Sequence, residues 1–260
     1  MKLWTLVENT TQRQDLTAEH GLSLYIEALG KRILFDMGAS GAFGKNAGKM
    51  GIDLSCVDIA LVSHAHADHG GGLLSFLLHN QKAPVYISQH GFSPCYNAEE
   101  KFIGLDPALS ENSRIRFVHD SITLEDGLYL YDCAGQTAPY PLDTAGLTVF
   151  RDGALQQEDF RHEQYLLIVE NGKRILLSGC SHRGILNIMD HFRPDVLIGG
   201  FHYMKKTPDS PELAENARLL GQYPTVYYTC HCTGVEQFHA MKPILGERLQ
   251  YLHTGSVIEI

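Results

Sequence analysis

The stretch 63–72 constrains this chain more than any other part of it. It reads Ser-His-Ala-His-Ala-Asp-His-Gly-Gly-Gly and directly follows the apolar run 59–62. If that run is a β-strand, His64 and His66 lie two residues apart and project from the same side of the chain. Neutral imidazole is a ligand that zinc and similar divalent cations prefer. The stretch therefore predicts a metal site rather than a polar loop that happens to be rich in histidine.

A second pair of ligand-type residues follows in the same stretch. Asp68 and His69 are expected in the turn that leads, through three glycines, into the apolar segment 73–78. Close strand-to-helix packing and metal access explain these glycines better than phosphate binding does. Four ligands on one corner can present two pairs to two neighbouring ions, so we expect two divalent metal ions. Zinc is the expected metal, and ligand type alone leaves manganese and iron open.

Composition limits the class of protein. A chain of 260 residues that is 44% hydrophobic can bury a full core. No apolar run is long enough to span a bilayer, and residues 1–8 meet an acid too early for a signal peptide. The six cysteines have no framework spacing, which indicates free thiols or ligands in a reducing compartment. We therefore expect a cytoplasmic protein with no membrane partner. The net charge of −9 also argues against nucleic acid as a partner.

Strand-like and helix-like segments alternate along the chain, which is typical of an α/β protein. Two passages read as hairpins, and both contain the pentapeptide Gly-Lys-Arg-Ile-Leu, at 30–34 and at 172–176. Convergent hairpin chemistry and a chain of two related halves both explain this repeat. We expect a single domain, 1–260, made of two similar halves at about 1–120 and 121–260.

Helices are best indicated in the second half of the chain. Ser210 is a capping residue before a proline at the first helical position. Other helices are expected from Gly184 and from Val235, the last of them disturbed by Pro243. The irregular segment 92–116 is expected to be a surface excursion over the site.

Further ligand-type residues follow three later apolar runs. They are Cys180 and His182 after 175–177, His202 after 195–198, and His231 after 226–228. In a layered α/β protein, sites are assembled where strands end. Each histidine alone is better explained as a structural residue. Together with the stretch 63–72, they indicate one site built from both halves of the chain.

The pattern at 63–72 resembles the signature His-x-His-x-Asp-His of the metallo-β-lactamase-fold superfamily. The likeness covers the whole chain and narrows to a branch similar to the group named after dihydropterin ribofuranosyl-aminobenzene-phosphate synthase. The segments that carry the branch resemblance are, in order, 8–10, 19–23, Asn46 with 51–54, 179–185, 199–202 and 230–234. The resemblance implies a four-layer αβ/βα sandwich of mixed sheets flanked by helices, with the metal site at one edge of the sheets.

The resemblance also implies roles for individual residues. It places His64 and His66 on a first metal ion. It places Asp68 and His69 on a second ion, to which His231 supplies the final histidine of the superfamily.

The remaining ligands are less uniform within the superfamily. The third histidine of the first metal is either His162 or His182, and we favour His182 because Gly-Cys-Ser-His is the hallmark of the branch. Cys180 occupies the place of the usual bridging aspartate, where it is either a thiolate ligand or a buried free thiol. His202 is a ligand or a substrate-side hydrogen-bonding group, and we favour the latter.

These residues predict a metal-dependent hydrolase acting on a small phosphate- or ester-containing molecule. Asp68 can bind metal and also orient the attacking water or take its proton. Redox members of the superfamily tend to have a carboxylate where this chain has His66, which favours hydrolysis. The alternatives are a transferase of the synthase type and a non-catalytic metal-binding sensor. We expect 92–116, 133–163 and the segment after His202 to shape the pocket.

Overall fold

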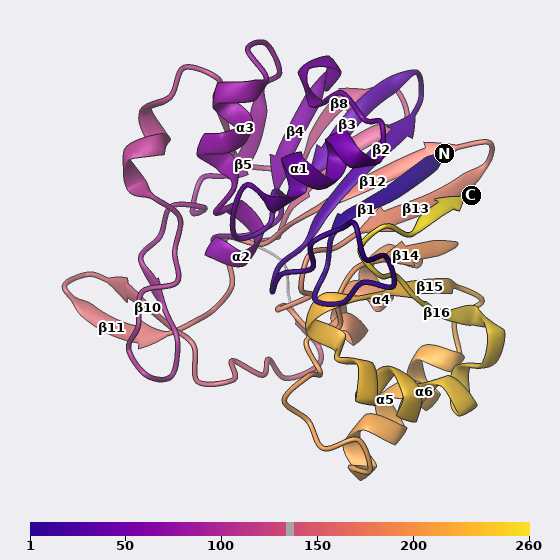
Figure 1. The fold of residues 1–260 in the computed structure, drawn as a ribbon. Helices are drawn as coiled ribbons and strands as arrows, with labels where there is room; N and C mark the ends of the chain where they lie inside the picture. Colours follow the sequence, from indigo (N-terminus) through magenta and orange to yellow (C-terminus); the bar gives the residue numbers. More distant parts are fainter. Residues whose placement is uncertain (134–137) are drawn as a thin grey trace.

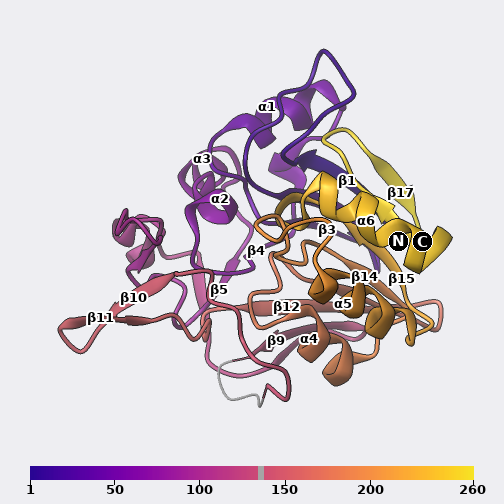
Figure 2. The same ribbon diagram turned by 90° about the horizontal axis from the view of Figure 1, so that it is seen from below.

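The computed structural model describes residues 1–133 and 138–260. Two seven-stranded sheets pack face to face, and helices cover the outer face of each sheet (Figure 1). The view from below shows the same layers with the chain ends close together (Figure 2), where the Met1 amino group donates to the Ile260 carbonyl oxygen. The predicted four-layer αβ/βα sandwich is confirmed. Residues 134–137, which belong to the predicted pocket segment 133–163, lie outside the described residues.

The first sheet has the strand order β17-β1-β2-β3-β4-β5-β7. Its strands β3, β4, β5 and β7 are parallel, so their carboxyl ends lie at one edge of the sheet. The strands are β1 (Lys2–Val7), β2 (Ser23–Ala28), β3 (Lys31–Phe35), β4 (Ile59–Val62), β5 (Val85–Ser88), β7 (Ile115–Val118) and β17 (Val257–Glu259). All four residues of β4 are buried, as its unbroken apolar sequence requires.

The second sheet repeats this plan, with the order β16-β15-β14-β13-β12-β9-β8 and parallel pairing from β13 to β16. Its strands are β8 (Ile122–Glu125), β9 (Leu128–Asp132), β12 (Gln164–Glu170), β13 (Lys173–Leu177), β14 (Val196–Ile198), β15 (Val226–Thr229) and β16 (Leu249–Tyr251). The chain thus passes from one sheet to the other between β7 and β8, and among the described strands only β17 returns to the first. The boundaries of the two similar halves stay a prediction.

Three buried clusters hold the layers together. Leu24 and Phe35 of the first sheet lie in the same cluster as Leu166 and Leu177 of the second, which forms the core between the sheets. A second cluster joins the first sheet to α1 and α3, and a third joins the second sheet to α4, α5 and α6. The helices are α1 (Ala42–Lys49), α2 (Ala67–Gly70), α3 (Leu73–His79), α4 (Ile185–Phe192), α5 (Pro211–Gly221) and α6 (Val235–Leu245). Within the described residues, no helix is both long and apolar enough to cross a membrane.

The two predicted hairpins are present as β2–β3 and β12–β13. Leu29 and Gly30 have φ angles of 52° and 71°, and Asn171 and Gly172 have φ angles of 53° and 77°. Positive φ at both turn residues matches the twist of the flanking strands, which explains the tight two-residue turns. A third, smaller sheet of β6 (Cys95–Tyr96), β10 (Thr148–Arg151) and β11 (Ala154–Gln157) extends from the main body (Figure 1).

Strand β4 ends at Val62, as the apolar run 59–62 predicted, and His64 and His66 lie in the loop beyond it. Two local expectations need correction. Asp68 lies in the one-turn helix α2 instead of an open turn. Helix α6 continues through Pro243, because a proline near the carboxyl end of a helix costs only one of its last hydrogen bonds.

Asn46 on α1 fixes the loop that precedes β2. Its buried side-chain amide donates to the carbonyl oxygens of Leu6 (2.7 Å) and Thr17 (2.8 Å), and its oxygen accepts from the Thr17 N–H (3.0 Å). This loop carries His20 and Asn9 toward the edge where the parallel strands end.

We expect Asn46→Ala to lower the free energy of unfolding by about 1–3 kcal/mol, because it leaves the buried carbonyl group of Leu6 and the partly buried backbone groups of Thr17 without this partner. Urea denaturation measures this change. The control Lys45→Ala alters an exposed residue of the same helix and should stay within about 0.5 kcal/mol of the native protein. Equal stability of both variants would contradict the role assigned to Asn46.

Candidate metal centre

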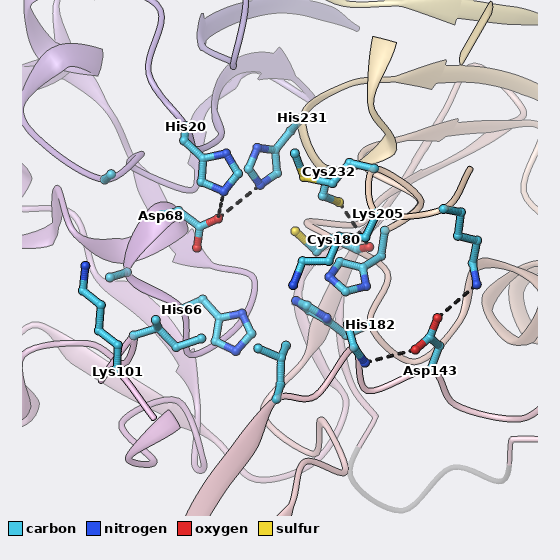
Figure 3. Close-up of a pocket in the computed structure, with 18 of the residues that line it drawn as sticks. His20, His66, Asp68, Lys101, Asp143, Cys180, His182, Lys205, His231 and Cys232 are labelled. Atoms are coloured by element: carbon cyan, nitrogen blue, oxygen red, sulfur yellow. Dashed lines mark hydrogen bonds and ion pairs between the residues drawn. The ribbon is translucent and has the colours of Figure 1, made fainter. Parts of the chain in front are cut away.

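The parallel strands of both sheets deliver their following loops to one edge of the molecule. The loop after β4 leads into α2, while the loops after β13, β14 and β15 approach from the second sheet. Between them lies a cavity of about 750 Å³ whose lining includes His66, Asp68, Cys180, His182 and His231 (Figure 3). The residues predicted from two distant parts of the sequence therefore meet in one place.

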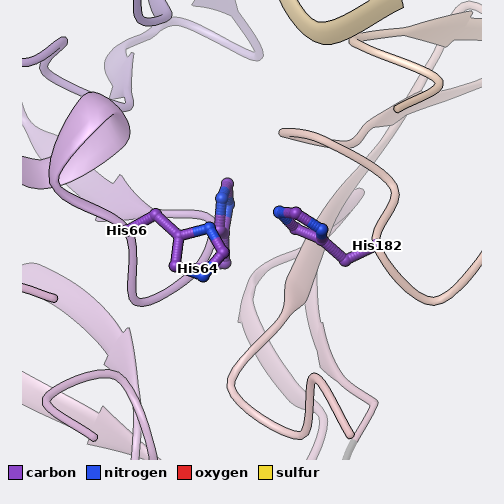
Figure 4. Close-up of side chains that lie close together, drawn as sticks. All are labelled: His64, His66 and His182. Atoms are coloured by element: carbon purple, nitrogen blue, oxygen red, sulfur yellow. The ribbon is translucent and has the colours of Figure 1, made fainter. Parts of the chain in front are cut away.

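The first group of ligand-type side chains consists of His64, His66 and His182. All three are buried, and their ring centroids lie 4.7–4.8 Å apart. The rings of His64 and His66, from the loop after β4, face that of His182, from the loop after β13 (Figure 4). The Nε2 atoms of His64 and His66 and both ring nitrogens of His182 have no hydrogen-bond partner. Buried polar atoms without partners are costly, so this group fits a metal ion that would accept their lone pairs.

The second group consists of Asp68, His69 and His231. The Nε2 atoms of His69 and His231 are 3.1 Å apart, and Asp68 Oδ2 lies 3.3 Å from His231 Nε2 and 3.8 Å from His69 Nε2. Two imidazole nitrogens and one carboxylate oxygen thus converge from α2 and from the loop after β15. This donor set is one that zinc accepts.

Cys180 lies between the two groups. Its sulfur is 3.1 Å from His69 Nε2. The sulfur lies within 4.8 Å of ligand atoms of His64 and His69, which form one possible ligand set with it. It forms a second such set with His231 and Cys232. Burial raises the pKa of the Cys180 thiol, so a bound cation would have to displace its proton. The position agrees with the bridging place that the superfamily resemblance implies.

His162 and His182 differ in what their rings offer. The Ala65 N–H donates to His162 Nδ1 (3.2 Å), so in the neutral ring Nε2 carries the proton and points to Glu158 Oε2, 3.6 Å away. With this tautomer His162 has no free lone pair, although its Nε2 has no hydrogen-bond partner and the residue converges with His66 and Cys95 in a further set of ligand-type atoms. His182 has a free lone pair and two ring nitrogens without partners. The geometry favours His182 as the ligand. His162 instead accepts a hydrogen bond from the backbone of Ala65, which lies between His64 and His66.

A buried carboxylate orients two of the ligands. Asp36, directly after β3, lies 2.6 Å from His69 Nδ1 and accepts from the Ser63 hydroxyl (2.7 Å) and the Ser63 N–H (2.6 Å). Because the Ser63 hydroxyl donates to Asp36, its oxygen can accept from His64 Nδ1 (2.9 Å). Protons on Nδ1 leave the Nε2 lone pairs of His64 and His69 free for a metal ion.

His231 is held in the same way from the first sheet. Its Nδ1 lies 2.7 Å from Asn9 Oδ1, and its backbone N–H donates to Glu8 Oε1 (2.9 Å). The proton is therefore assigned to Nδ1, and Nε2 faces Asp68. Two residues that follow β1 thus position a ligand that follows β15.

Burial sets the charge of the ligands. It lowers the pKa of His64 and His182 well below the ordinary histidine value and that of His66 to about 3, which keeps these rings neutral at pH 7. Burial would raise the pKa of Asp68, but His69 and His231 lower it below its usual range. Burial would also lower the pKa of His69, but the carboxylates of Asp36 and Asp68 raise it above the ordinary histidine value. Neutral imidazole and ionised carboxylate are the forms that bind a cation, so an ion bound by His69 would have to displace the proton of that ring when it is charged.

Several residues at the centre lie in the left-handed region of backbone conformation. Asp36, Ser181, His202 and His231 have φ angles of 60°, 57°, 57° and 49°. Residues other than glycine seldom adopt such angles, and the surrounding structure must compensate for their strain. All four follow the ends of strands at this edge. Backbone strain thus gathers where the ligand-type side chains converge.

His202 lines the cavity beside the first group, with its ring centroid 4.3 Å from that of His182. Among the described residues it joins none of the ligand sets whose atoms converge. Burial lowers its pKa to about 4, so the ring is neutral at pH 7. Its role as a substrate contact stays a prediction.

Sequence reasoning missed Cys232 and His20. Cys232 is buried and belongs to a convergent set with Cys180 and His231. His20 Nε2 lies 3.4 Å from Asp68 Oδ2 on the cavity wall, and 60% of the His20 side chain is exposed. Both residues lie in segments that carry the branch resemblance, which was the signal available to find them.

Comparison with known proteins identifies the family. A model of the metallo-beta-lactamase superfamily matches residues 16–225. The chain belongs to this superfamily. The superfamily resemblance at 63–72 is therefore confirmed, and with it a fold whose members usually bind metal ions.

Individual relatives agree with the branch resemblance. The chain is 26% identical over 285 residues to the 7,8-dihydropterin-6-methyl-4-(beta-D-ribofuranosyl)-aminobenzene-5'-phosphate synthase of Methanocaldococcus jannaschii, with 100% of this chain and 96% of that protein covered. It is 27% identical to Tm1679, a metal-dependent hydrolase of the beta-lactamase superfamily, with a TM-score of 0.86 and coverage of 100% and 99%. The metallo-beta-lactamase fold protein YhfI from Bacillus subtilis shares the fold, with 12% identity, a TM-score of 0.60 and coverage of 99% and 98%.

We expect His182→Asn to lose about one equivalent of bound metal, because it removes a lone pair that nothing else in the first group replaces. His162→Asn is the matched control. Its side-chain oxygen can still accept from the Ala65 N–H, so metal content should stay at the native level of about one to two equivalents per chain. Elemental analysis of the purified proteins measures both. Loss in His162→Asn with retention in His182→Asn would reverse the assignment.

Proposed function

We propose that this protein is a metal-dependent hydrolase with a dinuclear site. The observation that carries the proposal is the meeting of two ligand groups at one cavity, with Cys180 between them. In this proposal His64, His66 and His182 hold one ion, and Asp68, His69 and His231 hold the other. The nitrogen-rich donor set supports zinc, with manganese and iron as alternatives.

Divalent ions in such a site lower the pKa of water and neutralise negative charge on the attacked group. The chain supplies the remaining functions. Asp68 is ionised and about a quarter exposed to the cavity, so its Oδ2 is placed to orient a water molecule and accept its proton. His20, in contact with Asp68 Oδ2 and largely exposed, connects this carboxylate to solvent. His202 offers a neutral ring nitrogen to a substrate on the opposite wall.

Residue types at the centre support hydrolysis over redox chemistry. In the superfamily, di-iron redox members tend to have a carboxylate at the position of His66. Here that position is a buried neutral imidazole. The cavity volume of about 750 Å³ suits a small molecule.

The cellular setting and partners are also proposals. We propose a cytoplasmic protein that acts on a small molecule and has no nucleic-acid or membrane partner. All six cysteines, each within the described residues, are free thiols, which supports a reducing compartment. The net charge of −9 disfavours binding to a phosphate backbone.

A synthase is the second candidate function. It is favoured by the named relative from Methanocaldococcus jannaschii, which aligns along nearly its whole length. A non-catalytic metal sensor is a third candidate, and the complete ligand groups argue against it. Diphosphate release from a pterin diphosphate and a phosphoribosyl-aminobenzene distinguishes the synthase from a hydrolase.

We expect the zinc- or manganese-loaded protein to release p-nitrophenol from bis(p-nitrophenyl) phosphate or a p-nitrophenyl ester. Asp68→Asn should lower this rate by about 100-fold or more, because it removes the carboxylate that binds metal and handles the proton. The control Asp120→Asn changes an exposed carboxylate and should leave the rate unchanged. Diphosphate release without p-nitrophenol release would support the synthase, and turnover of neither would support the sensor.

A further inference from the structure

Two lysines stand on opposite sides of the cavity (Figure 3). Lys101 belongs to the excursion 92–116 of the first half, and Lys205 to the segment after β14 in the second half. Both side chains are exposed. Two segments far apart in sequence thus each contribute one cation to the wall above the candidate metal centre.

These lysines differ from their neighbour Lys206. The Lys206 ammonium lies 3.0 Å from Asp143 Oδ2 and 2.8 Å from Glu212 Oε1. These two ion pairs neutralise the charge of Lys206 and link the segments that carry the two acids. Within residues 1–133 and 138–260, no carboxylate lies at ion-pairing distance from Lys101 or Lys205. Glu100 precedes Lys101 in the sequence and Asp143 lines the same cavity, but in the described residues neither forms an ion pair with Lys101 or Lys205.

Each lysine is adjacent to an apolar side chain that also lines the cavity. Phe102 is 46% exposed and Met204 is 41% exposed, which is unusual for side chains of this size. The wall therefore presents a cation and an apolar surface from each half of the chain. Such a combination is suited to a ligand with an anionic group and an apolar group.

We propose that Lys101 and Lys205 form an anion-binding pair that selects phosphoric-acid esters carrying an apolar substituent. This proposal rests on the proposed hydrolase function and names its substrate class. Lysine binds phosphate as a point charge, whereas carboxylates are commonly bound by the fork of arginine. No arginine lines this cavity in the described part of the chain. From the two sides of the cavity, the pair would attract the anionic group toward the wall that carries Asp68, while Phe102 and Met204 offer apolar contacts to the substituent.

The reaction balances without a further reactant. Water oxygen forms a new bond to phosphorus, and the bond from phosphorus to the ester oxygen breaks with its electron pair on that oxygen. One proton of the water moves to the leaving oxygen. The products are an alcohol and a phosphate with one ester bond fewer.

Binding of phenylphosphonate, an anion that cannot be hydrolysed, tests the pair without catalysis. The neutral dimethyl phenylphosphonate has the same ring and is the matched probe. Isothermal titration calorimetry with the metal-free full-length protein should show binding of the anion in preference to the neutral probe. Lys101→Met and Lys205→Met should each weaken anion binding by about 5- to 10-fold. Lys173→Met, at the first residue of β13 and at the end of the strand away from the cavity, should leave anion binding unchanged.

The outcomes separate clearly. Equal affinity for the two probes, no binding of the anion, or native affinity in the Lys101 and Lys205 variants would overturn the proposal and leave these lysines as solvated surface charges. Thermal melting of each variant checks that the fold is retained. A drop in affinity for the anion alone, confined to these two variants, supports the pair.

Hydrolysis separates this proposal from the proposed function. With the metal-loaded protein, the double variant should lower kcat/KM for anionic bis(p-nitrophenyl) phosphate by about 10-fold or more and leave neutral p-nitrophenyl acetate unchanged. Failure of the native protein to hydrolyse either probe would contradict the hydrolase, while the calorimetry still decides the anion-binding pair. An equal loss on both probes would contradict charge selection.

Discussion

The buried carboxylate of Asp36 is the contact on which the candidate centre depends. It has no exposed surface, and its oxygens are shared among Ser63 and His69. A carboxylate taken out of water must be fully hydrogen-bonded, so these groups have little freedom to move. The Ser63 hydroxyl that donates to Asp36 also lies 2.9 Å from His64 Nδ1, so Asp36 acts on His64 through Ser63. One residue at the end of β3 thereby sets the ring orientation of a ligand in each of the two groups.

The centre also depends on how the two sheets pack. His64, His66, Asp68 and His69 follow a strand of the first sheet, whereas the other candidate ligands follow strands of the second. Apolar side chains from both sheets form one continuous core, which holds these loops at a common edge. Gly179 allows the loop after β13 to lie close to the loop after β4, since a Cβ atom at position 179 would overlap the Ser63 hydroxyl. The packing of this core therefore brings the candidate ligands of the first sheet and those of the second sheet into one site.

Much of this could be predicted from particular residues. Unbroken apolar runs predicted β4 and β13, and Asn171-Gly172 predicted a two-residue turn, because local sterics decide such features. The side chain of Ser210 accepts from the Leu213 N–H, as its capping role predicted. The course of α6 through Pro243 was not predictable, since tertiary packing decides where elements stop.

The sequence by itself determined the ligand types, their spacing at 63–72 and the layered α/β fold, because these follow from short-range chemistry and hydrophobic pattern. Only the tertiary structure shows that the Ala65 N–H, 97 positions away, donates to His162 Nδ1, which favours His182 as the proposed ligand. It also brought His20, Cys232 and the lysines at 101 and 205 to the same cavity. Contacts across such separations depend on the packing of the two sheets, so the branch resemblance can mark the segments of His20 and Cys232 without showing that these residues meet.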